Sequence, residues 1–326
     1  FSSRRRHTRY ISVTGVQTCA LPIYPAPAHL QGPRLKVAST STHGYSTLRL
    51  RRLTPVLGAE IEGIERNQEL TPTQFEEVSR ALAEHQVIFF RDQHLSAAQH
   101  LAFGQRFGAL HRHPAAPHAP GHPDLMIIQA DEHSPRANGE VWHSDVSCDA
   151  QPPMGSILYI HTCPPEGGDT LFASMYAAYD ALSDRMKRYL NGLTAVHDGE
   201  HVYRGTYANL GVQDKSLYPR SVHPVVRTHP VTGKPALFVN RGFTTRILGI
   251  PADESDAMLR FLFEHLENPL FQCRFRWQAN SVAFWDNRCV QHRAMWDYWP
   301  HKRSGFRVTV LGDTPYYTPG PESVTA

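Results

Sequence analysis

The chain has 326 residues, with 33 Lys and Arg against 30 Asp and Glu, which gives a formal charge of +3 at pH 7. This length allows one large domain or two. The sequence contains no apolar run approaching the roughly 18 residues that a transmembrane helix needs, so we expect no membrane partner.

The first 23 residues differ in composition from the rest. They contain four arginines, no acid and no apolar segment of the length that a secretory signal needs. This segment resembles a translated sequencing-adapter read, and we expect it to be such an artefact rather than a targeting segment. Without it the formal charge is 3 − 4 = −1. The basic balance is therefore no argument for a nucleic-acid partner.

The remaining chain reads as one folded unit. Residues 24–46 are rich in Pro, Ala, Ser and Thr, and they predict a disordered arm. Residues 47–320 predict a single domain, and 321–326 a short tail. The cysteines beyond the first segment are Cys148, Cys163, Cys273 and Cys289. Because none forms a CxxC pair, we expect a reducing, cytoplasmic location.

The predicted elements alternate irregularly along the chain. Residues 48–64 read as strand, turn and strand. Helices are predicted after the caps Thr71 and Ser96, on both sides of Ser183, and over 251–267. Short strands are predicted for "VIFF", "GSILYIHT", "PALFVN", "FQCRFRW", "SVAFWDN" and "FRVTVLG". Such a pattern favours a mainly β, α+β fold of the sandwich or jelly-roll type with helical insertions.

Three His-x-Asp or His-x-Glu triplets occur, and a chain with 20 histidines is expected to contain such triplets by chance. His122-Pro-Asp124 lies among prolines, which predicts a loop. His265-Leu-Glu267 lies in a predicted helix, where residues two apart point in different directions. His143-Ser-Asp145 lies in "EVWHSDVSC", which reads as extended chain, and there the two side chains would share one face.

A metal site needs a third ligand, and the candidate is His292, which follows a predicted strand and turn. Two histidines and one carboxylate on one face suit non-haem Fe(II), which keeps positions open for a cosubstrate and O2. The alternative is that His143 is a hydrogen-bonded core histidine and Asp145 a turn or cap residue.

Two arginines further along the chain indicate anion binding. Arg303 and Arg307 are four residues apart, so on a strand they point to the same side. Buried guanidinium groups need anionic partners, and arginine suits a carboxylate or a sulfonate. The alternative is a structural ion pair of either arginine with Asp286 or Asp313.

Four segments in order, "WHSDV", "GGDTLFASMYAAYDALS", "HPVVRTHPVTGKPALFVNRGFTTRI" and "WDNRCVQHRAMWDYWPHKRSGFRVTVLGD", resemble the taurine dioxygenase family. These taurine-catabolism enzymes are Fe(II)- and 2-oxoglutarate-dependent oxygenases. The resemblance covers about residues 48–318. It implies a double-stranded β-helix core, of jelly-roll or cupin-like form, with helical insertions. It also implies a homo-oligomer, either a dimer or a tetramer.

The resemblance also assigns residues to roles. Its catalytic metal ligands are His143, Asp145 and His292, and its 2-oxoglutarate contacts are Thr170 and Arg303. Its substrate contacts are His113, Tyr203, Phe243 and Arg307. The implied reaction uses O2 to convert 2-oxoglutarate to succinate and CO2 while a small anionic substrate is hydroxylated. A hydroxylated sulfonate then yields an aldehyde and sulfite.

Two positions depart from the family. Ala116 replaces a tyrosine that grips the sulfonate, and Gly139 replaces an asparagine near the substrate's amine. We therefore expect taurine to bind weakly, and bulkier sulfonates, alkyl sulfate esters or aryloxyalkanoates to be accepted. Two other classes stay open: a zinc hydrolase with the same ligands, which leaves Arg303 and Thr170 without a role, and a non-catalytic β-helix protein that binds iron or 2-oxoglutarate.

Overall fold

The computed structural model describes residues 44–64, 69–113, 115–209 and 214–319. The chain divides into two compact units, 1–34 and 35–326, and only the second contains described residues. The expected artefact at 1–23, most of the arm at 24–46 and the tail at 321–326 lie outside them. The last residues of that arm, 44–46, are described, and Ser46 donates hydrogen bonds to Glu77.

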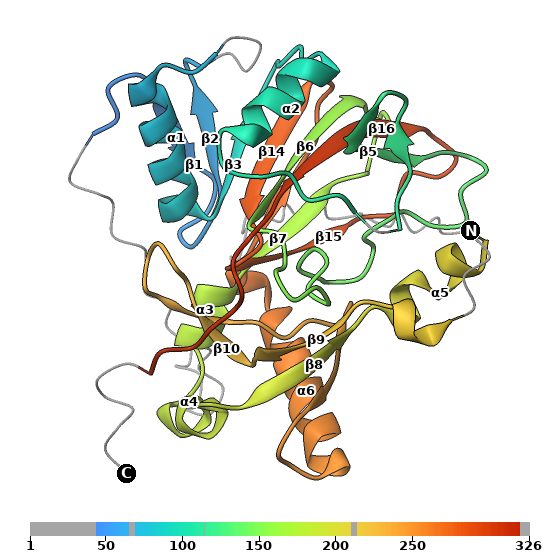
Figure 1. Ribbon diagram of the computed structural model, residues 1–326. Coiled ribbons are helices and arrows are strands. Elements are labelled where there is room, and N and C mark those ends of the chain that lie inside the picture. Colours follow the sequence, from blue (N-terminus) through green and yellow to red (C-terminus); the bar gives the residue numbers. More distant parts are fainter. Residues whose placement is uncertain (1–43, 65–68, 114, 210–213, 320–326) are drawn as a thin grey trace, which may run out of the picture. The chain divides into compact units, whose positions relative to one another are not determined.

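An eight-stranded sheet forms the largest layer (Figure 1), in the order β1-β2-β3-β14-β6-β16-β5-β4. Every neighbouring pair is antiparallel except β2 and β3. The strands are β1 Arg49–Arg52, β2 Ala59–Glu62, β3 Val87–Phe90, β14 Ser281–Asp286, β6 Gly155–Thr162, β16 Arg303–Val310, β5 His122–Ala130 and β4 His118–Ala119. This order places the C-terminal strands β14 and β16 on either side of β6, so distant parts of the sequence meet at the centre of the sheet.

Three smaller sheets complete the β structure of the described chain. The sheet β13-β7-β15 carries the segment that contains His292. Its strands are β13 Gln272–Phe275, β7 Thr170–Ser174 and β15 Val290–Ala294. The other two consist of β12 Thr244–Ile247, β8 Thr194–Asp198 and β9 Arg220–Pro224, and of β10 Val226–Thr228 with β11 Pro235–Leu237.

The main core contains side chains of both the large sheet and the β13-β7-β15 sheet. Ile160, Ala283 and Trp285 of the large sheet share one buried cluster with Phe172 and Phe275 of the smaller sheet. Apolar residues on the two facing sheets drive this association, because burial removes both faces from water. The expectation of a mainly β chain with inserted helices is confirmed.

The helices are α1 Pro72–His85, α2 Ala97–Gln105, α3 Met175–Asp180, α4 Asp184–Leu190, α5 Glu200–Asn209 and α6 Ala252–Leu266, with 3-10 turns at Lys215–Leu217 and Pro269–Phe271. Helices α1 and α2 pack against one face of the large sheet, and the other helices lie among the smaller sheets and loops (Figure 1). Thr71 and Ser96 are the N-caps that the sequence predicts, and Ser183, the predicted break between two helices, is the N-cap of α4. Helix α5 follows Asp198, whose carboxylate accepts from the backbone N–H of Glu200, and it was not predicted.

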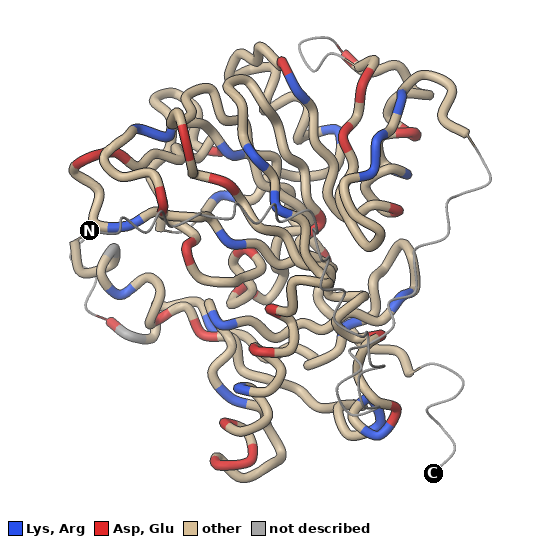
Figure 2. The backbone as a smooth tube through the Cα atoms, turned by 180° about the vertical axis from the view of Figure 1, so that it is seen from behind, with Lys and Arg blue, Asp and Glu red and all other residues tan. Residues whose placement is uncertain are grey.

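Basic and acidic positions are interspersed along the backbone in Figure 2. No helix in the described part of the chain combines the length and the apolar character that crossing a bilayer requires.

Candidate active site

One pocket, with a volume of about 310 Å³, contains every residue that the sequence assigns to a site. Its lining includes the proposed metal ligands, the proposed 2-oxoglutarate contacts and the proposed substrate contacts: His143, Asp145, His292, Thr170, Arg303, His113, Tyr203, Phe243 and Arg307. The pocket therefore combines polar and charged side chains with an apolar wall that includes Met126, Ile128 and Leu158.

His143, Asp145 and His292 converge in this pocket. Each offers a ligand atom, and these atoms all lie within 4.8 Å of one another. The Asp145 Oδ1 atom lies 3.6 Å from His143 Nε2 and 3.9 Å from His292 Nε2. An isolated β-bridge holds the two histidine backbones together, through N–H···O=C bonds of 3.2 and 2.9 Å.

The local backbone differs from the sequence prediction. Beyond its single bridge at His143, the segment is irregular, and Asp145 opens a turn that continues to Cys148. Val146 has a positive φ of 45° in this turn, a conformation that a β-branched residue rarely adopts. The prediction that His143 and Asp145 lie on one strand was therefore wrong, although their side chains do converge. The loop predicted for His122-Pro-Asp124 was also wrong, because β5 begins at His122.

The surroundings of the two imidazoles leave each Nε2 atom available to bind a metal ion. His143 Nδ1 lies 2.7 Å from the carbonyl oxygen of Val141; a carbonyl only accepts, so Nδ1 carries the proton and Nε2 offers its lone pair. The His292 ring packs against Trp285, with centroids 4.5 Å apart. Its buried Nδ1 has no hydrogen-bond partner in the part of the chain that the structure describes, which leaves its tautomer free to match a ligand at Nε2.

The protonation states of Asp145 and His292 also suit metal binding. Burial would raise the pKa of Asp145, but the positive charge of Arg307 and the two neighbouring histidines hold that pKa well below its usual value. Burial, followed by the proximity of His143, holds the pKa of His292 well below the ordinary value of histidine. An ionised carboxylate beside a neutral imidazole is the protonation state that metal ligation requires.

The two arginines of β16 have different partners. Arg303 is buried, and its Nε and Nη2 atoms have no hydrogen-bond partner among the described residues. Its guanidinium lies over the Trp277 ring at 5.2 Å, and Trp277 Nε1 donates to Thr170 Oγ1 at 2.9 Å. Arg307 Nη1 donates to Asp145 Oδ1 at 2.7 Å.

The alternative ion pairs for these arginines are not formed. Asp286 pairs with Arg288 and His229, and Asp313 pairs with Arg227. Arg303 is therefore a buried cation without a carboxylate partner among the described residues, and such a group is costly unless an anion binds it.

Residues 49–309 match the family described as "Taurine catabolism dioxygenase TauD, TfdA family". The chain belongs to this family. It is 33% identical over 281 residues to a Saccharomyces cerevisiae alpha-ketoglutarate-dependent sulfonate dioxygenase, covering 82% of this chain and 68% of that protein. An Acinetobacter baylyi alkylsulfatase is 36% identical over 276 residues, which cover 82% of this chain and 86% of that protein. The crystal structure of a taurine dioxygenase from Burkholderia xenovorans superposes with a TM-score of 0.72 at 34% identity, covering 85% of this chain and 93% of that chain.

The far side of the pocket in this family member is aromatic. The His113 ring lies 5.5 Å from that of Tyr203, which lies 5.9 Å from Phe243. Burial, and then the charge of Arg307, lower the pKa of His113 to about 3, so His113 is neutral near pH 7 and can donate one hydrogen bond. Ala116 also lines the pocket. Its methyl group leaves room that the tyrosine expected from the family would fill.

Gly139 also lines the pocket, and its backbone explains why it has no side chain. Its φ is +83°, and a Cβ atom there would lie 3.1 Å from His143 Cε1. Its carbonyl accepts from the backbone N–H of Ala294 at 2.8 Å. The side chain of a larger residue would contact the His143 ring closely and could displace it, so a glycine here leaves space for the proposed metal ligand.

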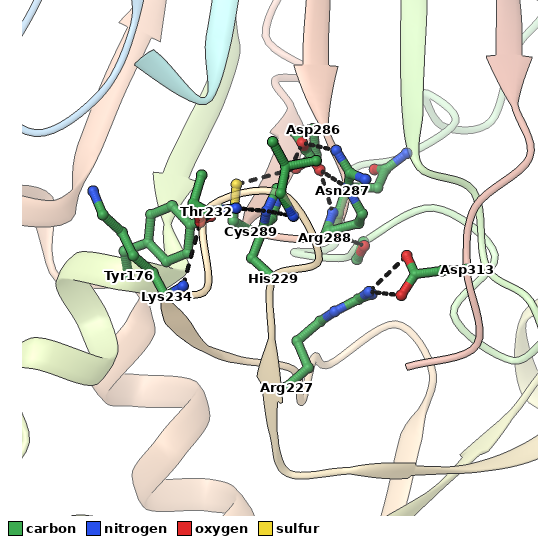
Figure 3. Close-up of polar contacts among 12 residues, drawn as sticks. Tyr176, Arg227, His229, Thr232, Lys234, Asp286, Asn287, Arg288, Cys289 and Asp313 are labelled. Carbon is green, nitrogen blue, oxygen red and sulfur yellow. Dashed lines mark hydrogen bonds and ion pairs between the residues drawn. The ribbon is translucent and has the colours of Figure 1, made fainter. Parts of the chain in front are cut away.

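A second group of potential ligands, His229, Asp286 and Cys289, lies outside the pocket (Figure 3). Arg288 donates to both Asp286 oxygens, and His229 Nε2 lies 3.0 Å from Oδ2. His229 Nδ1 accepts from the backbone N–H groups of Val231 and Thr232, so its proton lies on Nε2 and is donated to Asp286. Since the ligand atoms of His229 and Asp286 already have hydrogen-bond partners, and Cys289 Sγ donates to the Asp286 carbonyl oxygen at 3.8 Å, we interpret the cluster as a structural hydrogen-bond network and not as a second metal site.

Sequence analysis missed the residues behind Asp145. Ser156 Oγ donates to Asp145 Oδ2 at 2.7 Å, and Asn287 Nδ2 donates to Ser156 Oγ at 3.2 Å. The one signal was Asn287 in "WDN", at the end of a predicted strand.

Proposed function

We propose that the chain is an Fe(II)- and 2-oxoglutarate-dependent dioxygenase that hydroxylates a small organic anion, most favourably a sulfonate, which then releases sulfite and an aldehyde. The observation that carries the proposal is the meeting of His143, Asp145 and His292 in one pocket with the unpaired Arg303. Membership of the taurine dioxygenase family supports it.

The two histidines and Asp145 would hold the iron. When bound, Fe(II) supplies the activation of O2 that couples oxidation of 2-oxoglutarate to hydroxylation of the substrate. Val141 fixes the proton of His143 on Nδ1, so Nε2 stays available as a ligand. The protein provides position and charge, and the metal the reactivity.

Arg303 and Thr170 would hold the far carboxylate of 2-oxoglutarate. Two buried nitrogens of Arg303 have no partner within the described ranges, and Thr170 Oγ1, which accepts from Trp277, keeps its own hydrogen to donate. A carboxylate that receives these bonds would remove the charge imbalance at Arg303. In a zinc hydrolase, by contrast, Arg303 and Thr170 would have no role.

Arg307 and the neutral His113 would hold the anionic head of the substrate, and Tyr203 and Phe243 would cover its apolar body. Apolar walls exclude water from the reacting carbon and strengthen the charge interactions beside it. The space next to Ala116 supports a substrate bulkier than taurine. A sulfate ester is the second candidate, because a relative that matches 82% of this chain is an alkylsulfatase. An aryloxyalkanoate is a third.

We further propose that the large sheet and the β13-β7-β15 sheet form the two halves of a double-stranded β-helix, which their shared core supports. The free thiols of Cys148, Cys163, Cys273 and Cys289 support a cytoplasmic location. A dimer or tetramer stays a prediction, which the mass of the purified protein in solution tests.

The function is tested by measuring succinate from 2-oxoglutarate with Fe(II), O2 and a panel of sulfonates, sulfate esters and aryloxyalkanoates. The proposal predicts substrate-stimulated succinate, and sulfite in equal amount for sulfonates. A hydrolase or a non-catalytic binding protein would release no succinate with any member of the panel, and that result would reject the proposal.

A further inference from the structure

A buried chain of hydrogen bonds leads to the back of Asp145. Trp285 Nε1 and the backbone N–H of Asp145 both donate to Asn287 Oδ1, at 2.9 and 3.3 Å. Asn287 Nδ2 donates to Ser156 Oγ, and Ser156 donates to Asp145 Oδ2. Asn287 and Ser156 are both buried.

The direction of every bond in this chain is fixed by its ends. An indole N–H and a backbone N–H can only donate, so the Asn287 atom that they meet must be the amide oxygen. The amide nitrogen therefore faces Ser156 and occupies a lone pair of its oxygen. The single hydrogen of the Ser156 hydroxyl is left for the Asp145 carboxylate, which can only accept when ionised.

The consequence is a difference between the two oxygens of Asp145. Oδ2 is held at 2.7 Å by Ser156, whereas Oδ1 accepts from Arg307 Nη1 at 2.7 Å and faces the Nε2 atoms of both histidines. Since Asp145 lies in a turn, no strand register fixes its carboxylate. Ser144 Oγ also donates to the Asn287 carbonyl oxygen, at 2.7 Å, which ties the turn to the same asparagine.

We propose that Ser156, oriented by Asn287, is a positioning residue that presents one defined oxygen of Asp145 to the metal. Hydrogen bonds of this kind to metal ligands fix ligand orientation, and losing them weakens metal binding about 10- to 100-fold. The inference rests on the metal site of the proposed function, and it assigns Ser156 no contact with substrate.

The test is a titration of metal-free protein with Co(II), which reports its own coordination through its ligand-field absorption. Ser156→Ala should weaken Co(II) binding about tenfold or more and should change the absorption bands, because the freed Oδ2 can turn toward the metal. Ser156→Cys keeps the size of the side chain and donates only weakly, so it should show both effects even if the smaller residue impairs folding.

The matched control is Ser281→Ala. Ser281 is a buried serine of the same sheet, and its hydroxyl accepts from Arg91 and does not contact Asp145. This control should bind Co(II) as the unchanged protein does, with the same spectrum. If both Ser156 variants match the control in affinity and spectrum, the positioning role is rejected while the metal site stands. If the unchanged protein binds no Co(II), the proposed function itself fails.

Discussion

Arg307 and Asp145 form a buried ion pair in which Nη1 lies 2.7 Å from Oδ1. The same carboxylate oxygen faces the Nε2 atoms of His143 and His292. The arginine that we assign to the substrate is therefore also the counter-ion of a proposed metal ligand. A change at Arg307 should therefore affect substrate binding, and it should also affect how much a bound metal ion raises the free energy of unfolding.

Arg307→Met keeps the length of the side chain and removes its charge. Without metal, we expect the free energy of unfolding to fall by about 3–5 kcal/mol, because a buried carboxylate is left unpaired. A bound divalent ion would replace the missing positive charge. Urea unfolding with and without Co(II) should therefore show a larger metal-induced stabilisation in the variant than in the unchanged protein. An equal or smaller stabilisation would contradict this account of the pair.

Arg303 differs from Arg307, because it is a buried cation for which the described part of the chain supplies no carboxylate partner. Arg303→Leu should raise the KM for 2-oxoglutarate about 100-fold, because two charge-assisted hydrogen bonds contribute about 3 kcal/mol. Stability should hardly fall, since the replaced charge has no partner to leave behind.

The control for this variant is Arg227→Leu, which removes a buried arginine that donates to both oxygens of Asp313. It should lose about 3 kcal/mol of unfolding free energy with an unchanged KM. If Arg303→Leu instead unfolds as easily as Arg227→Leu and keeps its KM, Arg303 has a structural role.

The pocket beside Ala116 sets the size of the substrate in our account. Ala116→Tyr should lower kcat/KM for bulky sulfonates at least about tenfold, because the tyrosine would fill the space that their apolar groups occupy. One methylene group in a hydrophobic pocket is worth about 1–3 kcal/mol of transition-state binding. Taurine should be affected less or even gain. Sulfite release across a size series measures this, with Ala208→Tyr on the exposed face of α5 as the control. If taurine is already the best substrate of the unchanged protein, this interpretation of Ala116 is wrong.

The hydrogen bonds that Glu77 accepts from Ser46 and Thr47 should make the stability of the fold depend on pH in the acid range. Burial alone would raise its pKa, but hydrogen bonds from Ser46 and Thr47 lower it from 4.5 to about 2. A depressed pKa stabilises the fold above pH 4.5, and this contribution disappears as the pH falls from 4.5 toward 2. Glu77→Gln should cost about 1–3 kcal/mol at pH 7 and should flatten that part of the stability profile, measured by urea unfolding. An unchanged profile would show that the contact contributes nothing.

The sequence singled out the His-x-Asp pair whose side chains converge with His292, although the local structure predicted for each of the two pairs was wrong. His122-Pro-Asp124 starts strand β5, where a proline at the second position is tolerated near the strand end. Asp124 pairs with Arg112 there. His143 and Asp145 lie in a bridge and a turn that depend on His292, and this long-range pairing leaves no local pattern. The family segments, and not the periodicity, identified the pair.

The strands and caps were predictable because their signals are local. Ser96 and Thr71 start helices through contacts three residues away, and strand β6 has the bounds that its composition indicates. Ser156 and Asn287 were missed because they are separated by 131 positions and act through one hydrogen bond. A buried serine in a strand has no sequence signature that distinguishes it from ordinary core.

The most direct test of the central claim is anomalous diffraction at the iron edge, on crystals prepared without oxygen in the presence of Fe(II) and 2-oxoglutarate. Our account predicts one strong peak within coordinating distance of Nε2 of His143, Nε2 of His292 and a carboxylate oxygen of Asp145. A peak that lacks any one of these three side chains, or no peak in this pocket, would contradict it.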